Sequence, residues 1–350
     1  MLLPDLIFRI ITIIEGFIGT ILNLLTLLIV FKTHFGSKST TLLLRLQPIF
    51  DLIACFLHAV YTVTENDNFL ENNRPTEITF INGLLCYLWS YNIAFWFGVI
   101  LSVQNIVCIS IDRCIAVLLP IVYKTHHLLL ILIFTIYQVC MIGLLFTPII
   151  FFRSFVNDTC NYVAGPIGID SSTYVAFRGY TWLLFQYIIP VLIIVTSHLL
   201  IVIQLKRRQY QTKTLEISNN NIQHNKDYAW NEQKKLIGLV VVTALMSGQQ
   251  AALHLYESTR YFLTMLNIVI FNYGSIGQKM GPFLIVLSSC INPCIIISTT
   301  VSSVHNSING GTQFFGFFGE QNASEHPYKM RLFMDFLVTF LLIYIDVLSV

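Results

Sequence analysis

An Asp-Arg pair follows a long apolar run within "CISIDRCIAVLLPIVYK", residues 108–124. Asp112 and Arg113 stand where an apolar helix would leave a lipid bilayer, and charged side chains at such a place can reach the headgroups. A neighbouring carboxylate and guanidinium can also pair with one another and later exchange partners. The pair is therefore either a membrane-edge anchor or the working part of an ionic switch.

A second carboxylate, Asp51 in "LQPIFDLIAC", lies inside another apolar run. Ionisable residues are costly within a membrane and mark functional sites unless they are paired. Asp51 either helps to bind an ion or pairs structurally with Asn23 or another polar neighbour. We find no nucleophile placed beside a base, and the eight cysteines show no paired C-x-x-C spacing of a zinc site. The sequence therefore does not predict an enzyme.

The elements that must position these residues are membrane-spanning helices. The chain is 55% hydrophobic and only 11% charged, whereas about a quarter of the residues of a soluble protein are charged. A helix needs about 20 mostly apolar residues to cross the bilayer. Runs of that length predict an all-α membrane protein, a bundle of seven transmembrane helices at 7–31, 42–64, 82–111, 128–152, 181–205, 235–258 and 277–300.

The distribution of Lys and Arg predicts the orientation, because short cytoplasmic loops carry an excess of positive residues. After the first, third and fifth spans come Lys32, Lys38, Arg45, Arg113, Lys124, Lys206, Arg207, Arg208, Lys213, Lys226, Lys234 and Lys235. The other loops carry only Arg74, Arg153, Arg178 and Arg260. The N-terminus is therefore expected outside. The net charge is only +2, and no basic patch is interleaved with aromatic residues, so nucleic acid is not an expected partner.

The segment "DRCIAVLLPIVYK" is similar to the D-R-Y-x-A-V-x-x-P-L-x-Y block of the rhodopsin family of G-protein-coupled receptors. The residues in register are Asp112, Arg113, Ala116, Val117, Pro120 and Tyr123. "SSCINPCII" resembles the N-P-x-x-Y signature of the seventh span, with Asn292 and Pro293 in place. The chain thus looks like a rhodopsin-family receptor of a divergent orphan or peptide-receptor-like branch.

The resemblance implies roles for several groups of residues. Coupling to a trimeric G protein would involve Asp112, Arg113, Pro120, Tyr123, Asn292 and Pro293. An allosteric sodium ion, the one cofactor implied, would bind at Asp51, Ser102, Ser288 and Asn292. Cys86 and Cys160 look like the family's extracellular disulfide. Asn157 in "NDT" forms an N-x-T sequon on the predicted outer side, where glycosylation is expected.

Two positions at which the chain differs from amine receptors and opsins narrow the class of ligand. Phe95 occupies the place of the carboxylate in amine receptors, and Val286 that of the retinal lysine in opsins. A peptide is the expected ligand, consistent with charged residues in the outer loops such as Glu65, Asp67, Glu71, Arg74 and Glu77. Five aromatic residues are expected at the depth of the ligand cleft: Tyr91, Phe95, Trp96, Tyr187 and Tyr256. They either line the cleft or take part in ordinary packing between helices.

The chain departs from the family pattern in the spans that carry the signal. Ile296 replaces the Tyr of the seventh span, and the sixth span lacks the C-W-x-P block, with Gly248 and Gln250 near those places. Two alternatives stay open: a transporter or channel with Asp51, Glu15 and Asn292 along an ion path, and a receptor-like protein that does not signal.

We expect a multi-pass receptor of the plasma membrane with four parts. These are a short extracellular N-terminus (1–6), the receptor domain (7–300), a cytoplasmic tether (301–331) and a hydrophobic segment of unassigned role (332–350).

Overall fold

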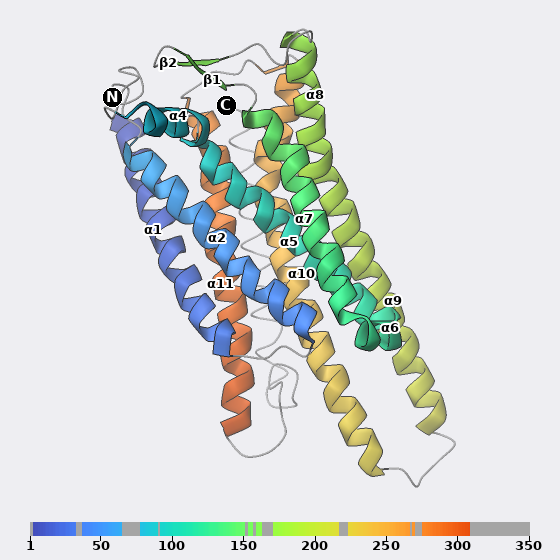
Figure 1. Ribbon diagram of the computed structural model, residues 1–350. Helices are drawn as coiled ribbons and strands as arrows, with labels where there is room; N and C mark the ends of the chain where they lie inside the picture. Colours follow the sequence, from blue (N-terminus) through green and yellow to red (C-terminus); the bar gives the residue numbers. More distant parts are fainter. Residues whose placement is uncertain are drawn as a thin grey trace. The chain divides into compact units, whose positions relative to one another are not determined.

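A computed structural model describes the greater part of the chain (Figure 1). The described residues are 3–32, 37–64, 78–89, 92–150, 153–156, 159–162, 171–216, 223–266, 268–269 and 275–308. Contacts divide the chain into two units, and the first, Met1–Gln223 with Leu239–Ser298, contains the helices that matter below. The described residues of the second unit, His224–Gly238 with Thr299–Val350, are helical.

Seven helices in the described part of the chain are long and apolar enough to cross a membrane. They lie within α1 (Leu3–Lys32), α2 (Lys38–Thr64), α5 (Ile93–Leu118), α7 (His127–Ile150), the continuous run from α8 (Ser171–Leu183) through η2 (Leu184–Ile188) to α9 (Ile189–Glu216), α10 (Gln223–Met265) and α11 (Ile276–Ile308). This confirms the predicted membrane protein of seven spanning helices.

The expected third span differs from the prediction at its start. A separate helix, α4 (Thr79–Leu88), precedes α5, and Asn92 between them has a left-handed backbone with φ of 60°. Asn adopts this conformation more readily than most residues because its short polar side chain bonds locally. Nδ2 of Asn92 lies 2.7 Å from Nδ1 of the buried His58. The single helix predicted over 82–111 was therefore wrong at this break.

The fifth span widens into a π-helical turn, η2, just before Pro190. Proline has no N–H, and its ring crowds the carbonyl four residues earlier, here that of Gln186. Such single π turns relieve this conflict without ending the helix. Gln186 and Tyr187 lie within this turn and line a cavity described below.

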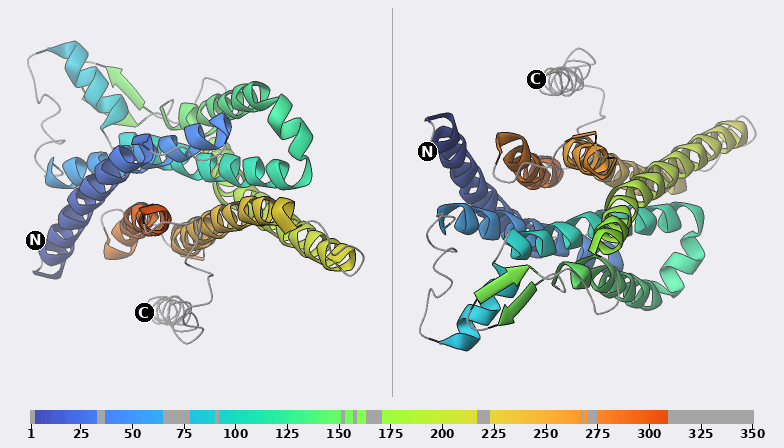
Figure 2. Two further views of the ribbon diagram at one scale, coloured as in Figure 1. Left: turned by 90° about the horizontal axis from the view of Figure 1, so that it is seen from below. Right: turned by 90° about the horizontal axis from the view of Figure 1, so that it is seen from above.

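A short hairpin connects the fourth and fifth spans. Strands β1 (Arg153–Val156) and β2 (Thr159–Tyr162) are antiparallel, with Phe155 opposite Cys160. The hairpin contacts α4 and lies beside it in both views of Figure 2. The Phe155 ring would be 3.3 Å from a Cβ placed on Gly83 of α4.

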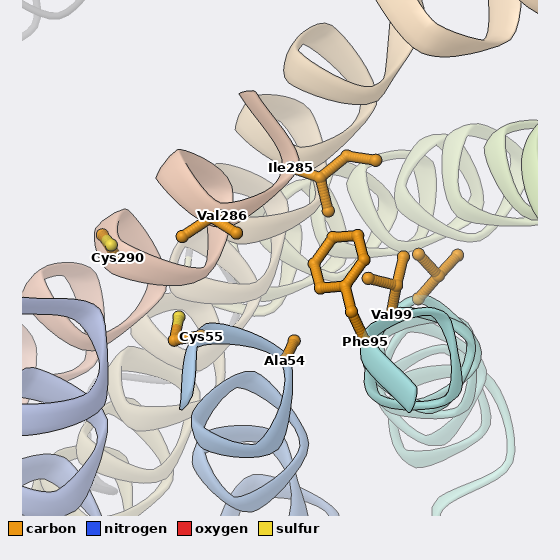
Figure 3. Packing of buried hydrophobic residues seen from close by; sticks show 8 residues of the cluster. Ala54, Cys55, Phe95, Val99, Ile285, Val286 and Cys290 are labelled. Carbon is orange, nitrogen blue, oxygen red and sulfur yellow. The ribbon is translucent and has the colours of Figure 1, made fainter. Parts of the chain in front are cut away.

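The main apolar cluster joins three spanning helices (Figure 3). Its members are Ala54 and Cys55 of α2, Phe95, Val99 and Val103 of α5, and Ile285, Val286 and Cys290 of α11. Gly98 allows the close approach, because a Cβ there would lie 2.8 Å from the backbone nitrogen of Ala54. Small residues at such contacts are typical of helices packed in membranes.

The helix bounds extend past the predicted receptor domain at both ends. α1 begins at Leu3, within the expected N-terminal segment 1–6, and α11 runs to Ile308, within the expected tether 301–331. Residues 309–350, with the remainder of the tether and the hydrophobic segment 332–350, lie outside the described residues.

Candidate functional site

The Asp-Arg pair lies in the interior of the bundle near the end of α5. Asp112 is 0% exposed and Arg113 is 4% exposed. Nε of Arg113 donates to Oδ2 of Asp112 at 3.1 Å, and Nη2 donates to the same oxygen. Burial on this scale favours the ionic switch over a membrane-edge anchor, since an anchor would expose its charge to headgroups.

Tyr123 holds both members of the pair from the next helix. Pro120 opens α6 (Pro120–Thr125), a position where its missing N–H has no helical partner to lose. The Tyr123 hydroxyl accepts from Nη2 of Arg113 at 2.8 Å and lies 3.0 Å from Oδ2 of Asp112. Burial raises the pKa of Tyr123, so the phenol keeps the proton that it donates to Asp112.

Two hydroxyls at the start of α2 complete the shell around Asp112. Oγ of Ser39 donates to Oδ1 at 2.8 Å, and Oγ1 of Thr40 donates to Oδ2 at 2.9 Å. Sequence reasoning missed both residues. The "STT" run at the start of the second span was the available signal, because buried hydroxyls within an apolar helix need partners.

Asp51 is fully buried and accepts four hydrogen bonds from protein side chains. Oδ1 accepts from Ser102 at 2.6 Å and from Ser289 at 3.1 Å. Oδ2 accepts from Gln47 at 3.0 Å and from Asn292 at 3.0 Å. The structure thus brings Asp51, Ser102 and Asn292 together as the resemblance implies, and it adds Gln47 and Ser289.

Ser288, the fourth residue of the predicted sodium site, contributes its backbone: its carbonyl accepts from Nε2 of Gln249 at 3.3 Å. A hard cation such as sodium requires oxygen lone pairs that point at it. The groups around Asp51 instead point hydrogens at its carboxylate, so this donor set does not fit the ion.

Pro293 explains why Asn23 faces α11. A proline cannot donate to the carbonyl four residues earlier, which here is the carbonyl of Ser289. Nδ2 of Asn23 donates to that carbonyl at 2.9 Å, and to Gly19 at 2.9 Å within its own helix. Side chains of neighbouring helices commonly satisfy groups freed by proline in membranes. Asn23 therefore ties α1 to the proline turn of α11.

Gln249 links α10 to the same turn. Its Nε2 donates to Oδ1 of Asn292 at 2.6 Å, besides the carbonyl of Ser288. This contact was not predicted. It lies one residue from Gly248 and Gln250, in the stretch where the family pattern is lost.

The aromatic residues predicted to line the ligand cleft fall into different environments. Phe95 packs in the apolar cluster, and Trp96 makes an edge contact with Trp182 at 5.2 Å. The hydroxyl of Tyr256 donates to the carbonyl of Gly277 at 3.0 Å. Tyr187 lines a cavity, and Tyr91 lies outside the described residues.

The cavity lies between α5, the π turn and α9 of the fifth span, and α10. Its polar lining consists of Gln186, Tyr187, Ser247, Gln250 and His254. No carboxylate is among the described residues that line it. Within the described part of the chain, Oε1 of Gln250 is buried without a hydrogen-bond partner. A ligand that donates a hydrogen bond would satisfy this oxygen.

Cys86 of α4 is disulfide-bonded. Cys160 lies in β2, opposite Phe155 of the strand that contacts α4, but its side chain is outside what the structure describes. The pairing of these two cysteines stays a prediction. The sequon residue Asn157 also lies outside the described residues.

A comparison with known protein families gives a match over most of the chain. The sequence profile of the family described as 7 transmembrane receptor (rhodopsin family) matches residues 22–296, which include both polar clusters. No curated protein sequence matches the chain.

Proposed function

We propose that this chain binds an extracellular peptide and activates a trimeric G protein. The chain belongs to the rhodopsin family of seven-transmembrane receptors and is a multi-pass protein of the plasma membrane. The observation that carries the proposal is the buried Arg113, which is neutralised by Asp112 and held by Tyr123. A buried charge held in this way is a two-state element that a partner can bias. In the other state Arg113 contacts the G protein, beside Pro120 and Tyr123.

Signal transmission would run through Gln249. Its contacts with Asn292 and Ser288 join α10 to the turn loosened by Pro293. Movement of α10 away from α11 breaks these hydrogen bonds, and the buried amide of Gln249 must find other partners. The sixth span therefore keeps a connection to the seventh although it lacks the Trp and Pro of the family.

The small cavity lined by Gln186 and Gln250 is where we place the contact of one peptide group with the fifth and sixth spans. Peptide N–H groups are neutral donors, which suits the unpartnered Oε1 of Gln250 in the described part of the chain. A protonated amine would find no carboxylate among the described lining residues. Gln250→Leu should weaken peptide potency about 2- to 10-fold, the effect of one hydrogen bond.

The test is G-protein recruitment in cells that are exposed to peptide libraries. Wild type should recruit a G protein in response to at least one peptide, and Arg113→Ala at equal surface expression should not. Equal recruitment by Arg113→Ala would contradict the proposal. Solute or ion flux that depends on Asp51, without recruitment, would favour a transporter or channel. The absence of both recruitment and flux would favour a receptor-like protein that does not signal.

A further inference from the structure

We propose that the side-chain amide of Gln47 takes the place beside Asp51 that a sodium ion would take, so that this receptor does not respond to sodium. Gln47 lies one helical turn before Asp51 on α2, and both residues are 0% exposed. Its Nε2 donates to Oδ2 of Asp51 at 3.0 Å and to Oγ of Ser102 at 2.8 Å. The amide thus bridges two of the residues implied as sodium ligands.

The orientation of the Gln47 amide follows from a backbone carbonyl. The Leu43 carbonyl can only accept, and the group 2.9 Å from it is Nδ2 of Asn105. The same Nδ2 donates to Oε1 of Gln47 at 2.9 Å. Because Oε1 faces Asn105, the N–H₂ group of Gln47 must face Asp51.

A second backbone carbonyl fixes the orientation of Asn292. The Ser288 carbonyl accepts from Nε2 of Gln249, and that nitrogen also donates to Oδ1 of Asn292 at 2.6 Å. The N–H₂ group of Asn292 must therefore face Asp51, as the 3.0 Å contact shows. Two independent chains of hydrogen bonds thus point N–H groups at one carboxylate.

The acceptor capacity of Asp51 is then filled. A carboxylate offers about four lone-pair positions, and Gln47, Ser102, Ser289 and Asn292 occupy that number. The Ser102 hydroxyl donates to Asp51 while it accepts from Gln47, so one of its two lone pairs is also engaged. A cation could reach the carboxylate only by displacing one of these four donors, and displacing Gln47 would leave a buried amide unpaired, which is costly.

The test is the thermal unfolding of the purified full-length protein, followed by tryptophan fluorescence in sodium chloride and in N-methylglucamine chloride at equal ionic strength. Wild type should unfold at the same temperature in both salts, within about 1 °C. Gln47→Ala removes the amide and leaves Asp51 open, so sodium should raise its midpoint by about 2 °C or more. Gln47→Glu, which keeps the size and adds an oxygen ligand, should show the same gain and serves if Gln47→Ala does not fold.

Two controls distinguish sodium binding at Asp51 from a general weakening of the packing around it. Gln138→Ala removes a donor to Oδ1 of Asn105, in the same network but without contact to Asp51, and should stay insensitive to sodium. Adding Asp51→Asn to Gln47→Ala should abolish the gain. Stabilisation of wild type by sodium, or no gain in either Gln47 variant, would overturn the proposal. Because the readout is unfolding, the outcome does not depend on G-protein coupling.

Discussion

Thr40→Val removes one donor from the Asp112 carboxylate and changes little else. The two side chains have nearly the same shape, and the hydroxyl that is lost donates to Oδ2 of Asp112 at 2.9 Å. Thr40 also lies 2.7 Å from the Tyr123 hydroxyl, but each of these two hydroxyls gives its single hydrogen to Asp112, so the bond to Asp112 is the one that the substitution removes. The paired state should become less stable than the released state.

The magnitude follows from the charge of the acceptor. A hydrogen bond to a charged group contributes about 1.5–3 kcal/mol. If Thr40 makes this bond only in the paired state, its loss shifts the equilibrium toward the released state by about 10- to 150-fold. Nucleotide exchange without ligand should rise by up to that factor, limited by the fraction of receptor already released.

The assay is GTPγS binding in membranes without ligand, at matched receptor density. Thr41→Val is the matched control, because the Thr41 hydroxyl donates to the Ser37 carbonyl, which also accepts from the Thr41 backbone N–H. Thr40→Val should raise basal exchange and Thr41→Val should not. Equal exchange by wild type and Thr40→Val would refute the reasoning that these hydrogen bonds hold Arg113 in the paired state.

Three further predictions concern stability and are checked by thermal unfolding. Gly19→Ala places a Cβ 2.6 Å from two thiols and should cost about 1–3 kcal/mol, whereas Gly248→Ala meets nothing within 4 Å and should leave the midpoint unchanged or higher. Asn23→Ala leaves the Ser289 carbonyl of α11 without this donor and should cost about 1–3 kcal/mol, and an unchanged midpoint would contradict its role in tying α1 to the proline turn. Asp5→Asn breaks a partly exposed ion pair with Lys279 and should cost less than about 1 kcal/mol.

The spanning helices could be predicted from the sequence because apolar runs of this length have few other solutions. The break before α5 could not, because it depends on a left-handed Asn92 that is stabilised by contact with His58 on another helix. The π turn before Pro190 was signalled by the proline, but the choice between a kink and a widened turn depends on packing.

The polar clusters were predicted in part. Asp51, Ser102 and Asn292 do meet, but the serine hydroxyl from α11 belongs to Ser289 rather than Ser288. Neighbouring residues project about 100° apart on a helix, and the rotation of α11 is set by its contacts rather than by its own sequence. Gln47 was detectable as a polar residue one turn from Asp51, although the direction of its amide depends on Asn105 of another helix.

The central claim is that Arg113, held by Asp112, is the group that is released to contact a G protein. Nucleotide exchange by a purified trimeric G protein with the receptor in lipid nanodiscs tests it directly. Thr40→Val should exceed wild type, and the double variant Thr40→Val with Arg113→Ala should fall to the level of Arg113→Ala alone. Raised exchange that survives in the double variant would contradict the claim, because activation would then not pass through Arg113.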